Sequence, residues 1–167
     1  PMASAIANTF RTMQGYIMSN ADGPRIQPGS RTCERSWIRD GSLEATALLY
    51  TGHPQQARAF LEWYAPFQYP SGKVPCVVDK RGPDPVPEHD STGQLIYALW
   101  KYYRMTGDRS LLEANLDRVV RGIDYIESTS SQGMSSITAR LRINFDGNEA
   151  LTQITETVYP MYKGLAH

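Results

Sequence analysis

Two short polar clusters carry most of the side chains in this sequence that could do chemistry. The first, Arg35-Ser36-Trp37-Ile38-Arg39-Asp40-Gly41, combines an aromatic ring, two guanidinium groups and a carboxylate. The second, Glu88-His89-Asp90, combines two carboxylates and an imidazole. Arginine donates hydrogen bonds in a fixed plane and aspartate accepts them, so together they suit vicinal hydroxyl groups, while a Trp face suits the apolar side of a sugar ring. We therefore expect a carbohydrate site lined by Trp37, Arg39, Asp40, His89 and Asp90.

The two aspartates also have a plainer interpretation. Asp40 and Asp90 each precede an apolar helical pattern, and Asp is among the preferred residues at a helix N-cap. Ser91 and Gln94 form an alternative capping box, with the serine as the cap and the glutamine three residues later. Capping alone does not explain the Trp, Arg, Glu and His side chains that surround the aspartates.

The charged neighbours leave alternatives open as well. Arg35 or Arg39 could simply pair with Asp40 or Glu34. His89 could serve as a general acid or base, as a metal ligand, or only as a structural side chain. One His beside two carboxylates is too small a set for a metal site, so we predict neither a metal nor an organic cofactor.

Apolar residues recur at helical spacing around both clusters. Two turns, Thr51-Gly52 and Thr106-Gly107, end apolar patterns and are typical helix stops. The pattern predicts five helices: residues 3–19, a short helix of about ten residues from Leu43, one through residues 57–64, one through 95–103 and one through 112–126.

A polar cluster, a helix, a Thr-Gly turn and a second helix occur twice in this order. Repeated αα-hairpins at such a period predict a mainly α fold, an array or a partial (α/α)6 toroid. Because successive helices alternate in direction, the helices that follow Asp40 and Asp90 should run parallel. Both clusters should then lie at one rim of the array.

Two further segments do not follow the helical pattern. The long, proline-bearing connection 67–90 could hold an extended piece at Val74–Val78. Residues 137–146 alternate between apolar and polar side chains and end at Asp146-Gly147, which predicts a β-hairpin. We accordingly divide the chain into a helical-hairpin region, 1–130, and a β-hairpin-like tail or insertion, 131–167, packed on the same domain.

Composition excludes several classes of function. The 167 residues are 41% apolar and 20% charged, with a net charge of zero. A neutral chain offers no electrostatic footprint for nucleic acid or an anionic membrane, and no apolar run is long enough to span a bilayer. The sequence opens at Pro1 rather than Met, so it leaves the compartment open.

Two segments together resemble the first hairpins of the (α/α)6-barrel, six-hairpin glycosidases. The first is Arg35–Gly41, followed by a short helix, and the second is Pro87-Glu88-His89-Asp90-Ser91-Thr92-Gly93-Gln94-Leu95-Ile96-Tyr97-Ala98-Leu99. The glucoamylase-like glycoside hydrolases match best, over roughly residues 31–127. In that family the Trp-x-Arg-Asp segment binds the non-reducing sugar. The resemblance implies that Trp37, Arg39 and Asp40 contact the sugar next to the cleaved bond. It also implies that Asp90 and Gly93 line the same rim.

The sequence departs from the family in two ways. A full barrel is considerably longer and holds more helices than the five predicted. The family's general acid is a Glu in a Trp-Glu segment after the next hairpin, and nothing after Glu127 matches that segment. Glu88 is therefore our candidate for a catalytic acid, by elimination.

We expect part of a glycoside hydrolase catalytic domain that hydrolyses α-linked glucosyl-type substrates, with an oligosaccharide or polysaccharide as its partner. The alternatives are a non-catalytic sugar-binding module and a helical-repeat interaction protein. An open half-toroid would expose apolar helix faces, which predicts self-association or contact with the remaining barrel half.

Overall fold

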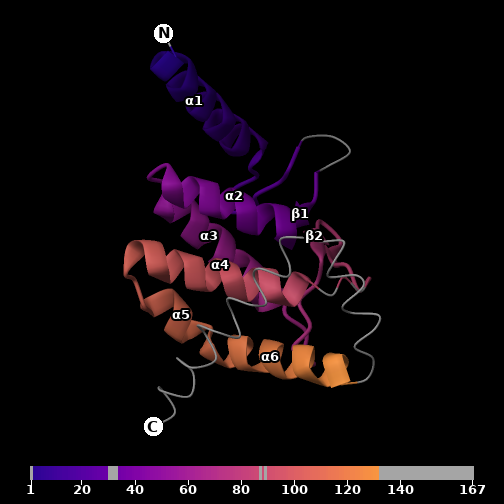
Figure 1. Cartoon of the computed structure of the whole chain (residues 1–167). Helices are drawn as coiled ribbons and strands as arrows, with labels where there is room; N and C mark the ends of the chain where they lie inside the picture. Colours follow the sequence, from indigo (N-terminus) through magenta and orange to yellow (C-terminus); the bar gives the residue numbers. More distant parts are fainter. Residues whose placement is uncertain (1, 30–33, 87, 89, 132–167) are drawn as a thin grey trace.

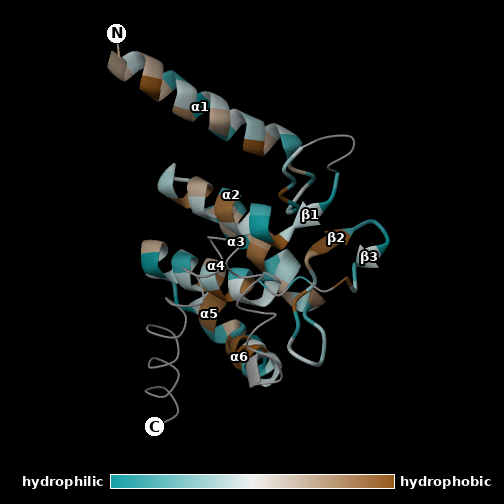
Figure 2. Cartoon of the chain, turned by 45° about the vertical axis from the view of Figure 1, so that its right-hand side comes forward, coloured by the Kyte–Doolittle hydropathy of each residue, from teal (hydrophilic) through white to brown (hydrophobic). Residues whose placement is uncertain are grey.

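Helices dominate the described part of the chain, so the mainly α prediction is confirmed. The computed structural model describes residues 2–29, 34–86, 88 and 90–131. In this part a small antiparallel sheet holds β1 (Ser36–Trp37), β2 (Val77–Asp79) and β3 (Gly82–Pro83) (Figures 1 and 2). The helices are α1 (Met2–Asn20), α2 (Ile38–Tyr50), α3 (Pro54–Tyr64), α4 (Ser91–Thr106), α5 (Ser110–Ala114) and α6 (Leu116–Ser131), with a 3-10 turn, η2, at Ala65–Phe67.

Helices α2 and α4 lie side by side and run in the same direction (Figure 1). An ion pair between Arg39 and Asp90 joins their N-terminal ends. The Lys101 ammonium lies 5.1 Å from the centre of the Tyr50 ring at their C-terminal ends. The predicted parallel arrangement of these two helices is confirmed, and Arg39 of the first cluster meets Glu88 and Asp90 of the second at one rim.

The core forms where α2, α3 and α4 meet. Phe60 of α3 is fully buried and packs so closely on α2 that a Cβ added at Gly41 would overlap its ring. Glycine directly after Asp40 therefore allows α3 to approach the first turns of α2. The largest fully buried side chains include Tyr64, Phe60, Ile38, Leu48, Leu61, Leu95, Leu99 and Leu111.

The two Thr-Gly turns end α2 and α4 as predicted. Gly52 and Gly107 adopt φ angles of +85° and +73°, in the left-handed region that glycine adopts without a Cβ penalty. The Gly107 N–H donates to the Tyr103 carbonyl, which satisfies one of the last acceptors of α4. After the first turn, Thr51-Gly52, Pro54 begins α3, and its missing N–H costs no helical hydrogen bond at that position.

The fifth predicted helix is divided into α5 and α6, and the expectation of one continuous helix was wrong. Asn115 ends α5 at φ −115° and ψ 9°, outside helical geometry. Its side-chain Nδ2 donates to the Leu111 carbonyl at 2.9 Å, while its own carbonyl accepts from Arg118 and Val119 at the start of α6. Asparagine thus offers the backbone local partners that replace the continuous helical pattern.

The long connection 67–90 contains the hairpin β2–β3. The predicted extended piece at Val74–Val78 overlaps the observed strand, which begins at Val77. Ser36 pairs with Val78 and Trp37 with Val77, so β2 lies between β1 and β3. This pairing fixes the residues before α2 against a segment forty positions later in the chain.

Helix α1 was predicted correctly at 3–19, but none of its residues is buried. Figure 2 shows hydrophobic residues along α1, which stands apart from the other helices. Ile6, Phe10 and Met13 are each more than half exposed. With α2, this helix borders an apolar groove of about 670 Å³. The predicted self-association stays a prediction.

The predicted tail, including the β-hairpin at residues 137–147, lies outside the described residues, as does most of the proposed segment 131–167. The proposed domain boundary at residue 130 also stays a prediction. None of the described helices combines the length and the apolar character that a bilayer crossing requires.

Candidate functional site

The candidate site is the rim where β1 leads into α2 and the long connection leads into α4. Trp37 ends β1, and Arg39 and Asp40 lie in the first turn of α2. Glu88 and Asp90 precede α4, directly across from α2. The predicted site residue His89 lies outside the described residues. The structure therefore brings Arg39 together with Glu88 and Asp90, although about fifty positions separate them in sequence.

Arg39 joins the two clusters through a forked ion pair. Its Nε donates to Asp90 Oδ2 at 2.7 Å, and its Nη2 donates to Asp90 Oδ1 and Glu88 Oε2, each at 2.9 Å. The Asp90 side chain is 2% exposed, whereas Arg39 and Glu88 are 34% and 33% exposed. The hydrogen bonds to Asp90 raise the pKa of Arg39 further above its ordinary value. A buried carboxylate thus holds a guanidinium group whose other side reaches solvent.

The capping interpretation of the two aspartates was wrong. Trp37, not Asp40, is the N-cap residue of α2. Asp90 occupies the N-cap position of α4, but its side chain makes no capping hydrogen bond and binds Arg39 instead. Gln94 completes no capping box either, because its Oε1 accepts from Ser42 Oγ at 2.7 Å in the buried interface of α2 and α4.

Arg35 makes a second ion-pair network beside the first. The sequence had suggested Asp40 or Glu34 as its partner, but Arg35 pairs with Asp79 and Asp84 instead. Its Nε donates to Asp79 Oδ2 at 3.0 Å and its Nη2 to Asp84 Oδ2 at 2.9 Å. Neither carboxylate was among the residues predicted from the sequence, although the two stand on either side of Lys80-Arg81-Gly82-Pro83, the turn of a short hairpin. That turn is a signal that could have paired them.

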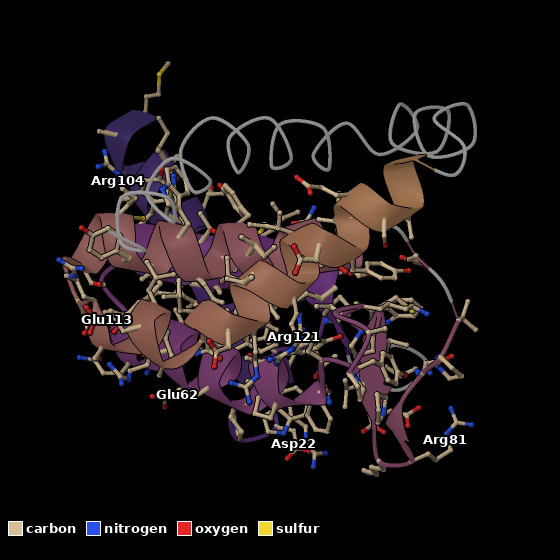
Figure 3. All side chains as sticks on the ribbon, turned by 90° about the horizontal axis from the view of Figure 1, so that it is seen from below. Asp22, Glu62, Arg81, Arg104, Glu113 and Arg121 are labelled. Carbon is tan, nitrogen blue, oxygen red and sulfur yellow. The ribbon has the colours of Figure 1, made fainter. Side chains whose placement is uncertain are left out.

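The pKa values of these two carboxyl groups are lowered. The main cause at Asp79 is a hydrogen bond from the Arg81 side chain, and Arg35 adds a smaller effect. The main cause at Asp84 is the backbone N–H of Val86, followed by the hydrogen bond from Arg35. Figure 3 shows Arg81 at the outer edge of the hairpin, away from the helices. Both carboxylates therefore stay ionised at mildly acidic pH and keep their hold on Arg35.

Glu44 is a further titratable group that the sequence analysis missed. It lies one helical turn after Asp40 on the same face of α2. Burial, followed by the charge of Asp40, raises the pKa of Glu44 to about 7. Its Oε2 is buried and makes no hydrogen bond to the described residues. No periodic pattern marks such a residue, because a single Glu in a helix is normally solvated.

No group of three or more His, Cys, Asp or Glu side chains in the described ranges is arranged to hold a metal ion.

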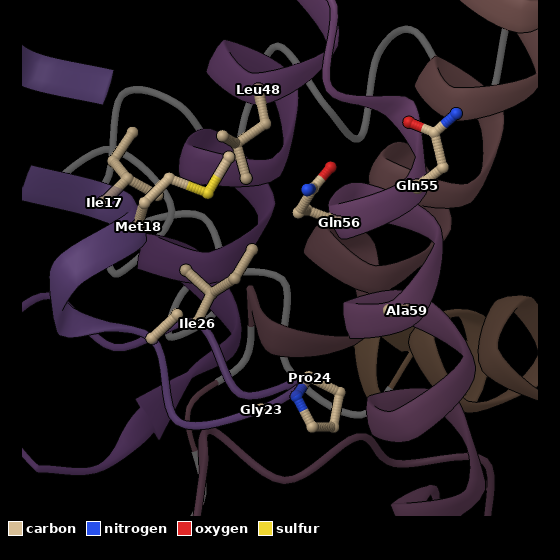
Figure 4. A pocket seen from close by; sticks show the side chains of 10 residues that line it. Ile17, Met18, Gly23, Pro24, Ile26, Leu48, Gln55, Gln56 and Ala59 are labelled. Atoms are coloured by element: carbon tan, nitrogen blue, oxygen red, sulfur yellow. The ribbon is translucent and has the colours of Figure 1, made fainter. Parts of the chain in front are cut away.

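A cavity lies away from the rim. It has a volume of about 320 Å³ and lies between the end of α1, the following loop, α2 and α3 (Figure 4). Its lining includes Ile17, Met18, Ile26 and Leu48, and Leu48 is near the opposite end of α2 from Arg39.

Part of this chain is similar to a curated protein. The chain is 28% identical to Trehalase 1 of Sulfolobus acidocaldarius in an alignment 117 positions long, and the match covers 50% of this chain and 20% of that protein. The chain therefore spans about a fifth of the length of the curated relative. No protein-family model matches it, and no solved structure does. The similarity to a trehalase, which is a glycoside hydrolase, supports a carbohydrate-active role in general.

Proposed function

We propose that this chain forms the sugar-holding part of a glycoside hydrolase catalytic domain that acts on α-linked glucosyl-type substrates. The observation that carries this proposal is Arg39, which joins Glu88 and Asp90 to the start of α2. The similarity to a trehalase supports it independently. In this proposal Trp37, Arg39 and Asp40 hold the sugar unit next to the cleaved bond, and Asp90 and His89 line the same site.

Each residue type has a definite part in holding a sugar. The two oxygens of Asp90 orient the guanidinium plane of Arg39, so its donors are fixed before a hydroxyl group arrives. Asp40 follows directly and supplies acceptors for the same hydroxyl groups. Trp37 supplies an aromatic face for the apolar side of the ring. Since Arg39 is partly exposed, a ligand can reach it without unfolding the rim.

Glu88 is the proposed general acid. Its carboxylate accepts from Arg39 Nη2 and is one-third exposed. A general acid must lie within hydrogen-bond reach of the leaving oxygen. The contact with Arg39 therefore has to be broken, and the Glu88 carboxylate has to take up a proton from solvent, before Glu88 can donate that proton to the leaving oxygen.

A second candidate function belongs to a different class, a non-catalytic sugar-binding module. The residues that would hold a sugar are present in the given sequence, whereas no match to the Trp-Glu segment of the family that the chain resembles stands among residues 128–167. Such a module would keep Trp37, Arg39 and Asp40 as a sugar subsite without turnover.

The test is calorimetric titration of the chain with glucose, maltose, trehalose and a glucosidase-inhibiting iminosugar, while hydrolysis of both disaccharides is followed in parallel. Asp40→Ala removes a proposed sugar contact. Asp124→Ala, on the exposed surface of α6, is the matched control. We expect binding that Asp40→Ala weakens by about tenfold or more and that Asp124→Ala leaves unchanged, the loss of a hydrogen bond to a charged group being worth about 1.5–3 kcal/mol.

The outcomes separate the candidates. Turnover that Glu88→Gln abolishes supports the catalytic proposal. Binding without turnover supports the sugar-binding module. If a well-folded sample binds none of the four sugars, both candidates fall and the interaction-protein alternative takes their place.

A further inference from the structure

Arg35 lies where the three strands and the rim meet. It directly precedes β1, while its partner Asp79 ends β2 and its partner Asp84 directly follows β3. The guanidinium group is therefore held from two sides by carboxylates of the hairpin, at 3.0 and 2.9 Å. Two anchors fix the plane of the group, whereas one would let it swing.

The same guanidinium group lies against the Trp37 ring, with its Cζ atom 5.5 Å from the ring centre. This distance is within the range of a cation–π contact. Arg35 directly precedes β1 and Trp37 ends it, so a single residue, Ser36, separates the guanidinium group from the ring along the chain. The ring is half-buried and thus has room to change its side-chain angles if this contact is lost.

The Trp37 backbone is already fixed by other contacts. Trp37 pairs with Val77 of β2, and the Ile38 N–H donates to the Cys76 carbonyl at 3.0 Å. These bonds hold the main chain but leave the rotation of the indole about its side-chain bonds open. The contact with the Arg35 guanidinium group, by contrast, is made by the ring itself.

We propose that Arg35 is a positioning residue that holds the Trp37 indole in its sugar-stacking orientation, and that Asp79 and Asp84 act through Arg35. The inference rests on the proposed function, because it takes Trp37 as a sugar contact. It adds a hairpin-borne support to the rim, which neither the sequence clusters nor the similarity to a trehalase contains. Arg39 and Arg35 then have separate tasks, since Arg39 binds hydroxyl groups and Arg35 binds the ring that stacks on the sugar.

The first experiment needs no sugar. The indole N–H signal of Trp37 is identified in a ¹⁵N–¹H correlation spectrum by its loss in Trp37→Phe. Arg35→Ala should move this signal, because the cation leaves the ring. Arg58→Ala, which breaks ion pairs to Glu62 and Asp108 far from the ring, should not move it. An unmoved Trp37 signal in a folded Arg35→Ala sample overturns the proposal.

The second experiment is a double-mutant cycle on sugar affinity, with maltose and an iminosugar as probes. Arg35→Ala should weaken binding by about threefold to thirtyfold, in line with the loss of a cation–π contact. In a Trp37→Ala background it should have no further effect, because its action passes through the ring. A purely structural role would instead weaken binding equally in both backgrounds, and that result contradicts the proposal.

A third variant covers a failure of Arg35→Ala to fold. Asp84→Asn removes one of the two anchors at a partly exposed position. It should broaden or move the Trp37 signal and weaken binding less than Arg35→Ala does. The two proposals also fail in different ways. If Trp37→Ala itself leaves binding unchanged, Trp37 is not a sugar contact, whereas a loss in Trp37→Ala without one in Arg35→Ala removes only the positioning role.

Discussion

Replacing Arg39 by Ala should destabilise this protein strongly, because the Asp90 carboxylate would stay buried without its partner. Asp90 is 2% exposed, and Arg39 binds both of its oxygens, at 2.7 and 2.9 Å. Breaking a buried ion pair by removing one partner costs about 3–5 kcal/mol. Because the Arg39 side chain is about one-third exposed and its charge is screened, we expect about 2–4 kcal/mol.

The assay is urea unfolding of four proteins, the unchanged chain, Arg39→Ala, Asp90→Asn and the double variant. If the pair acts as a unit, Asp90→Asn should recover part of the loss in the Arg39→Ala background. The coupling energy from this cycle should then be about 2 kcal/mol or more. The control cycle uses Arg109 and Glu113, an exposed pair one helical turn apart, which should give about 0.3–0.5 kcal/mol. A rim coupling no larger than the control would refute the reasoning, because it would mean that water replaces Arg39 around Asp90.

Three further predictions concern buried or crowded positions. Burial raises the pKa of Glu44 to about 7 from 4.5, so the stability that its protonated form supplies at low pH is lost as the pH rises through 7. In urea unfolding, Glu44→Gln should therefore be more stable than the unchanged chain by about 1–3 kcal/mol at pH 8. At pH 4 the two proteins should be nearly equal in stability. A stabilisation equal at both pH values would contradict this. Gly72 and Gly52 both have a positive φ, of +90° and +85°, but a Cβ at Gly72 would overlap a backbone carbonyl of α6, whereas a Cβ at Gly52 would meet open space. Gly72→Ala should therefore lower the free energy of unfolding by at least about 2 kcal/mol more than Gly52→Ala does. Equal losses would show that α6 shifts to make room for the Cβ. Gly41→Ala should cost about 1–3 kcal/mol through its overlap with Phe60, and Phe60→Leu should recover part of that loss unless the clash is not the cause.

Much of the helical arrangement follows from the sequence. The helix ends at Gly52 and Gly107 depend on turn chemistry that acts within a few residues. The alternation of hairpins then gives the helix directions, and these bring the segments of Arg39 and Asp90 to one rim. Short-range signals of this kind can be read from the chain because the interactions behind them are themselves local.

The division at Asn115 and the burial of Glu44 were beyond such signals. The pattern of apolar residues continues through Asn115, and only the hydrogen bond from its side chain to Leu111 shows why the helix is interrupted there. Glu44 has a pKa near 7 because the packing around α2 partly shields it from water, next to the charge of Asp40.

The sequence by itself determined which residue types stand at the rim, whereas only the tertiary structure decided which of them are partners. Arg35 and Arg39 had several carboxylates within reach along the chain. In the folded chain Arg35 forms ion pairs with Asp79 and Asp84, and Arg39 forms ion pairs with Glu88 and Asp90. The physical reason is that an ion pair gains strength where packing excludes water. The buried position of Asp90, set by the contact of α2 with α4, is a property of the whole fold.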